Sequence, residues 1–125
     1  MLKILLVEDS AIQRNMVVNH LAKRGHNVLT ASTVDMAKET YQANKPIDLI
    51  IADVNLEFED GIDFVRDLNA SNPNEFKALI ISSLNVKPEI LRARKAGALA
   101  WIVKPIPFDK LDRAIEKIFY SQMQK

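Results

Sequence analysis

Residues 47–53, with the sequence IDLIIAD, form an apolar run of strand length that ends in the carboxylate of Asp53. Three other short apolar runs also end in residues that carry a charge or a hydroxyl group. They are Ile4–Val7 before Glu8 and Asp9, Ala78–Ile81 before Ser82 and Ser83, and Trp101–Val103 before Lys104. The carboxyl ends of parallel strands share the sheet edge where open α/β proteins bind ligands. The sequence therefore predicts that these residues converge at one site.

Strand-like runs alternate with helix-like stretches along the chain. A continuously apolar run such as Ile4–Val7 is typical of a strand covered on both faces. Further strands are expected near residues 27–30, 47–53, 78–82 and 100–103, and further helices near 33–43, 61–70 and 107–122. Residues that favour helix ends stand between the runs: Ser10 and Asp60 as N-caps, Pro88 in a first turn, and Gly25 and Gly97 after the last turns.

Five β–α units predict an α/β fold of the doubly wound (βα)5 type. Right-handed crossovers favour a flavodoxin-like three-layer sandwich with a parallel sheet in the order 2-1-3-4-5. A length of 125 residues is in the range of a single domain, so residues 1–125 are expected to form one unit.

Composition excludes several classes of function. The chain has no cysteine, so disulfides and zinc–thiolate sites are excluded. A net charge of +1, with cations spread along the chain, gives no support for a nucleic-acid or membrane surface. No apolar run approaches the roughly 20 residues that a bilayer requires, and the start at Met1 has no signal-peptide pattern. We therefore expect a cytoplasmic protein.

Glu8, Asp9 and Asp53 form a group of carboxylates that predicts a metal site. Oxygen ligands without His or Cys favour Mg²⁺ or Mn²⁺ over zinc or copper. Asp53 is also a candidate nucleophile toward phosphorus, which would give an aspartyl phosphate. Two simpler interpretations stay open: Glu8 and Asp9 could only cap the next helix, and Asp53 could only begin a turn.

Lys104 and Ser82 are candidates for binding a phosphoryl group, the first as a point charge and the second through its hydroxyl. Each also has an ordinary explanation, because most lysines are solvated and serine suits a strand-to-helix turn. Trp101, the one tryptophan of the chain, is better explained by packing than by function on sequence grounds alone.

Taken together, these residues resemble the receiver domain of bacterial two-component response regulators over the whole chain. The resemblance rests on Leu5–Ser10, on Asp53 with Gly61 eight residues later, on Ile80–Ser83, on Ala96–Ala98 and on Trp101–Pro105. Five motifs in order at fitting spacing are far more specific than any one of them.

The resemblance implies a role for each site residue. Asp53 would be the phosphoacceptor, Asp9 would bind Mg²⁺ directly, Glu8 would bind it through water, and Asn55 would offer its backbone carbonyl. Ser82 would be the switch hydroxyl, Lys104 the phosphoryl-binding lysine in a cis bond to Pro105, and Trp101 the aromatic switch.

The implied function is a phosphorylation-dependent switch similar to single-domain chemotaxis regulators, not an enzyme beyond its own phosphorylation and dephosphorylation. The phosphoryl donor would be a sensor histidine kinase or a histidine phosphotransfer protein. The signal would pass through the fourth helix, fifth strand and fifth helix to a downstream protein, with no direct contact to nucleic acid or membrane.

The chain also departs from the family pattern. Glu57 stands where a proline is common, which should loosen the loop at 55–60 and add charge beside the site. Leu99 and Ala100 replace an acidic pair that transcription-factor receivers often carry, so dimerisation through salt bridges of that kind is not expected. Two alternatives are a phosphatase of the haloacid dehalogenase type, which requires an acid where this chain has Asn55, and a degenerate receiver that is never phosphorylated.

Overall fold

The computed structural model describes residues 1–123, which form seven strands and five helices. In chain order they are β1 (Lys3–Val7), α1 (Ala11–Lys23), β2 (Asn27–Ala31), α2 (Val34–Asn44), β3 (Leu49–Asp53), β4 (Asn55–Leu56), β5 (Glu59–Asp60), α3 (Gly61–Ser71), β6 (Lys77–Ser82), α4 (Lys87–Ala96), β7 (Ala98–Val103) and α5 (Phe108–Met123). No helix within this range is long and apolar enough to cross a membrane.

The main sheet has five parallel strands in the order β2-β1-β3-β6-β7. Because β6 and β7 are its fourth and fifth strands along the chain, the predicted order 2-1-3-4-5 is confirmed. The strand predicted from about Ala100 begins earlier, at Ala98, and the ladder between β6 and β7 has an irregularity near Ala78 and Leu79.

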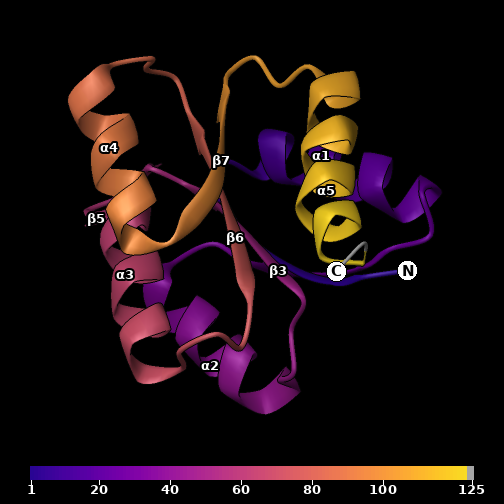
Figure 1. The fold of residues 1–125 in the computed structure, drawn as a ribbon, viewed down its shortest axis with the longest axis horizontal. Coiled ribbons are helices and arrows are strands. Elements are labelled where there is room, and N and C mark those ends of the chain that lie inside the picture. The colour runs from indigo at the N-terminus through magenta and orange to yellow at the C-terminus, as the bar shows by residue number, and fades with distance from the viewer. Residues whose placement is uncertain (124–125) are drawn as a thin grey trace.

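Helices cover both faces of the sheet, with α1 and α5 on one side and α2, α3 and α4 on the other (Figure 1). Side chains alternate between the two faces along each strand. In β1, Ile4 and Leu6 join the core under α1 and α5, whereas Leu5 and Val7 join the core under α2, α3 and α4. Burial on both faces explains the continuous apolar runs in the sequence.

The predicted helix ends are confirmed. The Ser10 side chain accepts a hydrogen bond from the amide of Gln13, and Asp60 accepts bonds from the amides of Ile62 and Asp63. Pro88 lies in the first turn of α4, and Gly97 follows its last turn with a φ of +111°. These contacts satisfy backbone groups that a helix leaves without partners at its ends.

The segment that Glu57 was expected to loosen is instead a hairpin of β4 and β5, with Glu57 and Phe58 between the paired strands. Phe58 has a φ of +64°, and Glu57 is not among the residues with positive φ. This pattern of signs is that of a type II turn, in which the second residue is often proline. Two-residue strands carry no periodic signal, which is why the hairpin was not predicted.

Candidate functional site

The registers of the parallel strands bring the predicted site residues to one edge. Val7 pairs with Ala52, which places Glu8 level with Asp53 in the next strand. Further along the sheet, Asp53 pairs with Ile81, and Ser82 is the next residue after Ile81. Ser82 in turn pairs with Val103, and Lys104 is the next residue after Val103. The predicted convergence at the carboxyl ends of the strands is confirmed.

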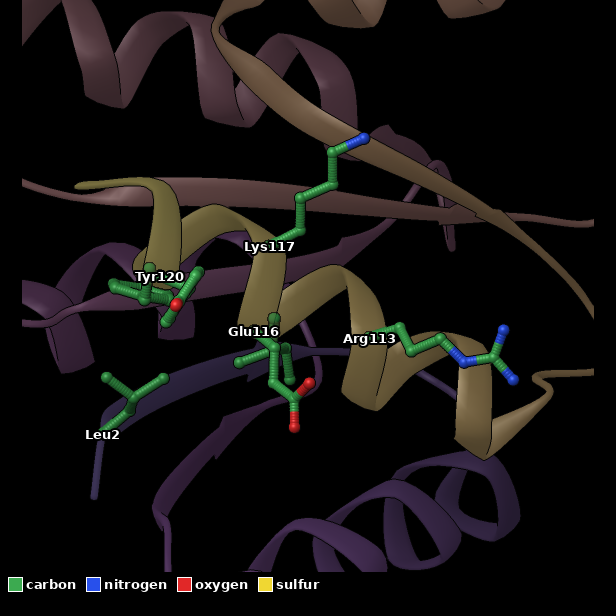
Figure 2. Close-up of a pocket in the computed structure, with 7 residues that line it drawn as sticks. Leu2, Arg113, Glu116, Lys117 and Tyr120 are labelled. Atoms are coloured by element: carbon green, nitrogen blue, oxygen red, sulfur yellow. The ribbon is translucent and has the colours of Figure 1, made fainter. Parts of the chain in front are cut away.

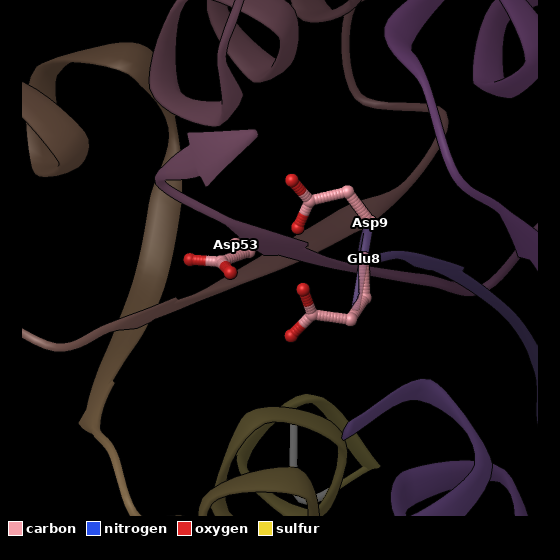
Figure 3. Close-up of side chains that lie close together, drawn as sticks. All are labelled: Glu8, Asp9 and Asp53. Carbon is pink, nitrogen blue, oxygen red and sulfur yellow. The ribbon is translucent and has the colours of Figure 1, made fainter. Parts of the chain in front are cut away.

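Glu8, Asp9 and Asp53 form a compact acidic group, in which one ligand atom from each lies within 4.8 Å of the others. Figure 3 shows Glu8 and Asp9 at the end of one strand and Asp53 on its neighbour. Glu8 and Asp53 are buried, whereas Asp9 is more accessible. Burial, together with the nearby charge of Asp53, raises the pKa of Glu8 to about 7. An oxygen-only group under this repulsion fits a hard divalent cation such as Mg²⁺.

Lys104 lies against this acidic group. Its Nζ atom lies 2.5 Å from Asp53 Oδ2 and 3.1 Å from Glu8 Oε1, and its side chain is only 18% exposed. Burial alone would lower the pKa of Lys104, but the hydrogen bonds and charges of the two carboxylates raise it. The following bond to Pro105 is cis, as the resemblance predicts. The site thus holds a permanent cation beside its candidate nucleophile.

Backbone amides hold the Glu8 and Asp53 carboxylates, and a side-chain donor holds the main chain of Glu8. The Ser10 amide donates to Glu8 Oε2 at 3.2 Å, and the Asn55 amide donates to Asp53 Oδ1 at 3.2 Å. Arg14, in the first turns of α1, donates from Nη1 to the main-chain carbonyl of Glu8 at 2.9 Å. Sequence reasoning missed Arg14, although a cation five residues after an acidic pair that precedes a helix is a signal for such a contact.

A second missed contact comes from Glu57, whose amide donates to Asp9 Oδ2 at 2.9 Å. Proline has no N–H, so the common family residue at this position could not make this bond. The replacement at 57 therefore adds a donor to a carboxylate of the acidic group.

Gly61 closes the base of the β4–β5 hairpin against Asp53. Its amide donates to the carbonyl of Val54 at 2.9 Å, and a Cβ atom on Gly61 would lie 2.0 Å from the carbonyl oxygen of Asp53. Only glycine allows this approach. The spacing of eight residues between Asp53 and Gly61 thus has a steric cause.

Ser82 and Trp101 are connected through the backbone of Leu84. The Ser82 hydroxyl oxygen accepts a bond from the Leu84 amide at 2.9 Å, and the Trp101 indole N–H donates to the Leu84 carbonyl at 3.1 Å. Trp101 is partly buried against the core, as the packing interpretation predicts, and its polar edge also has a defined partner.

Another hollow lies between the start of β1 and the second half of α5 (Figure 2). It measures about 710 Å³, and its lining includes Leu2, Phe119 and Tyr120 with the charged Arg113 and Glu116. Because Leu2 precedes β1, this hollow is at the opposite end of the sheet from the acidic group. A groove of about 430 Å³ lies instead beside Trp101, between β7, α4 and α5.

Comparisons with known proteins agree with this geometry. The family model described as "Response regulator receiver domain" matches residues 4–116. Chemotaxis protein CheY of Thermotoga maritima is 30% identical over 117 residues, which cover 93% of this chain and 96% of that protein. The structure of chemotaxis protein CheY4 of Vibrio cholerae superposes with a TM-score of 0.88 at 28% identity, over 95% of this chain and 99% of that one. The CheX–CheY–BeF3–Mg complex of Borrelia burgdorferi has the same fold, with a TM-score of 0.88 at 24% identity over 94% of this chain and 89% of that one.

Proposed function

The chain belongs to the response regulator receiver domains of two-component signalling, and from this premise we propose that it is a phosphorylation-dependent switch with Asp53 as its phosphoacceptor. The donor is a sensor histidine kinase or a histidine phosphotransfer protein, and the signal passes to a downstream protein. The observation that carries the proposal is Lys104 Nζ at 2.5 Å from an oxygen of Asp53, beside the acidic group of Glu8 and Asp9.

In the proposed transfer, an Asp53 oxygen bonds to phosphorus while the phosphorus–nitrogen bond of the donor's phosphohistidine breaks. The electron pair of that bond stays on the imidazole nitrogen, which takes up a proton from solvent. The amide of Asn55 already holds the other Asp53 oxygen, so the attacking carboxylate is oriented in advance. Lys104 then binds an oxygen of the transferred group, which relieves its close pairing with the free carboxylate.

Mg²⁺ fits the oxygen donors of the site, and Mn²⁺ has the same ligand preference. Asp9 would bind the ion directly, Glu8 through water, Asp53 through its carboxylate and Asn55 through its carbonyl. When bound, the ion would neutralise phosphoryl oxygens during in-line transfer. The Borrelia burgdorferi relative forms its complex with BeF3 and Mg, which supports the same pairing of metal and phosphoryl mimic here.

The proposed switch runs through Ser82 and Trp101. A phosphoryl group on Asp53 would draw the Ser82 hydroxyl toward it and away from the amide of Leu84. Because the Leu84 carbonyl accepts the bond from the Trp101 indole, a shift of the Leu84 backbone would change the position of the indole. The Ser82 and Trp101 side chains would thus have one arrangement without the phosphoryl group and another with it. A partner that binds one of these arrangements more tightly shifts the equilibrium toward it.

The α4–β7–α5 surface, formed by Lys87–Ala96, Ala98–Val103 and Phe108–Met123, is the proposed output surface. It contains the groove beside Trp101, and two large apolar side chains, Leu91 and Leu99, are exposed on α4 and β7. Exposed apolar side chains on a surface that also has a groove favour a partner with an apolar contact face. They also support the expectation that salt bridges at positions 99 and 100 are not used.

Intact-mass measurement after incubation with acetyl phosphate or phosphoramidate and Mg²⁺ tests the proposal. We expect a gain of one phosphoryl group, about 80 Da, that is absent in Asp53→Asn and reduced when the metal is removed. Asp67→Asn, an exposed acid on α3, is the matched control and should gain the same mass. Absence of any gain with both donors would instead indicate a degenerate receiver, and rapid turnover of diverse phosphate esters would indicate a phosphatase.

A further inference from the structure

The β4–β5 hairpin touches the acidic group through its turn. The Glu57 amide donates a hydrogen bond to Asp9 Oδ2 at 2.9 Å, and this bond does not use the other oxygen of the carboxylate. A hydrogen bond of this kind fixes the rotation of a carboxylate, so less ordering is needed when a cation binds. The hairpin turn therefore orients one proposed metal ligand.

The same hairpin is held at its base by β3. The bond from the Gly61 amide to the Val54 carbonyl and the close approach of Gly61 to the Asp53 carbonyl leave little freedom there. Leu56, at the centre of the hairpin, is buried in the core. The hairpin is therefore a packed element and not a free loop.

The last residue of the hairpin, Asp60, is bound by Arg92 of α4. Arg92 Nη2 lies 2.6 Å from Asp60 Oδ2 and 2.8 Å from Glu89 Oε2, and Nη1 lies 3.1 Å from Asp63 Oδ1. Two nitrogens of one guanidinium face the Asp60 carboxylate, a geometry that fixes orientation as well as distance. Arg92 thus ties the output helix to the start of α3 and the end of the hairpin.

We propose that the β4–β5 hairpin couples α4 to the metal site, so that Arg92, which does not touch the acidic group, sets its affinity for Mg²⁺. Arg92 holds the hairpin through Asp60, and the hairpin holds Asp9 through the Glu57 amide. This inference rests on the proposed function only in taking Mg²⁺ as the cation. It provides a connection to α4 that is separate from Ser82 and Trp101.

Coupling of this kind is reciprocal. If a partner bound to α4 changes the affinity for Mg²⁺ by some factor, then Mg²⁺ changes the affinity for that partner by the same factor. The partner on the output surface would therefore tighten or loosen the metal site. Because the Arg92 side chain is 37% exposed, the coupling should weaken as the salt concentration rises.

Calorimetric titration of Mg²⁺ into wild type and variants tests the coupling. We expect Arg92→Met to weaken Mg²⁺ binding by about threefold to fivefold, which lies within the range found for coupled positions. Asp60→Asn keeps a good N-cap for α3 while it removes the charge that Arg92 binds, so it should have the same effect. Arg66→Met, which removes a guanidinium paired with Asp63 and Asp67 on the same helix, is the control and should leave the affinity unchanged.

A second substitution, Glu57→Pro, tests whether the effect of Arg92 passes through the Glu57 amide. The turn accepts proline at this position, but the N–H that donates to Asp9 is lost. In this background Arg92→Met should have no further effect on Mg²⁺ binding, whereas in Glu57→Ala, which keeps the N–H, the effect should persist. Equal effects of Arg92→Met in both backgrounds, or no effect in wild type, would overturn the coupling. If wild type itself does not bind Mg²⁺, the proposed function fails first, so the two failures are distinguishable.

Discussion

Metal binding to this protein should depend steeply on pH because of Glu8. Burial and the charge of Asp53 raise the pKa of Glu8 to about 7, so the metal-free protein keeps a proton there under mildly acidic conditions. A divalent cation favours the ionised carboxylate and must displace this proton. The affinity for Mg²⁺ therefore falls as the pH drops below 7.

The size of the effect follows from the proton competition. With a pKa of about 7, the apparent Kd rises by a factor of about 11 at pH 6 and only about 1.1 at pH 8. Mg²⁺ should thus bind about tenfold more weakly at pH 6 than at pH 8, and near pH 7 each ion should release about half a proton.

Isothermal titration calorimetry in buffers of different protonation enthalpy measures both quantities at constant ionic strength. Glu8→Gln should bind Mg²⁺ more weakly than wild type at pH 8 but with little change between pH 6 and pH 8. Glu57→Gln, which removes an exposed acid beside the site, should keep the tenfold dependence. An equal Kd at pH 6 and pH 8 in wild type, or a full pH dependence in Glu8→Gln, would refute the role assigned to Glu8.

Four substitutions have defined effects on stability. Gly61→Ala should lower the free energy of unfolding in urea by about 2–3 kcal/mol and slow phosphorylation, because its Cβ would press on the Asp53 carbonyl. Gly25→Ala, with a φ of +86° but open space around it, should cost only about 1 kcal/mol and leave phosphorylation unchanged. Tyr41→Phe should leave the free energy of unfolding unchanged or raise it by about 1 kcal/mol, since the buried hydroxyl has no hydrogen-bond partner among residues 1–123; a clear loss would mean that the hydroxyl is bonded. The stability that Glu8 contributes to the metal-free protein is fully present below pH 4.5 and is lost as the pH rises through about 7. Glu8→Gln should therefore be more stable than wild type at pH 8 and lose this advantage at pH 5. Thermal unfolding of both proteins at the two pH values would show the difference.

The position of the site was predictable from sequence for a topological reason. Short apolar runs that end in Asp9, Asp53, Ser82 and Lys104 indicate strands buried on both faces, and parallel strands bring their carboxyl ends together. The helix ends at Ser10 and Gly97 were predictable as well, because capping depends on local backbone chemistry.

What the sequence by itself determined was the five strands of the main sheet, their order and the group of residues at one sheet edge, since these depend on local periodicity and on connection rules. Only the tertiary structure decided how that group is held. The hydrogen bond from the Glu57 amide comes from the main chain, which has no sequence signature. Arg92 and Asp60 are 32 residues apart in the sequence and come into contact because α3 packs beside α4. The raised pKa of Glu8 has the same origin, because burial and a neighbouring charge arise only when distant segments come together.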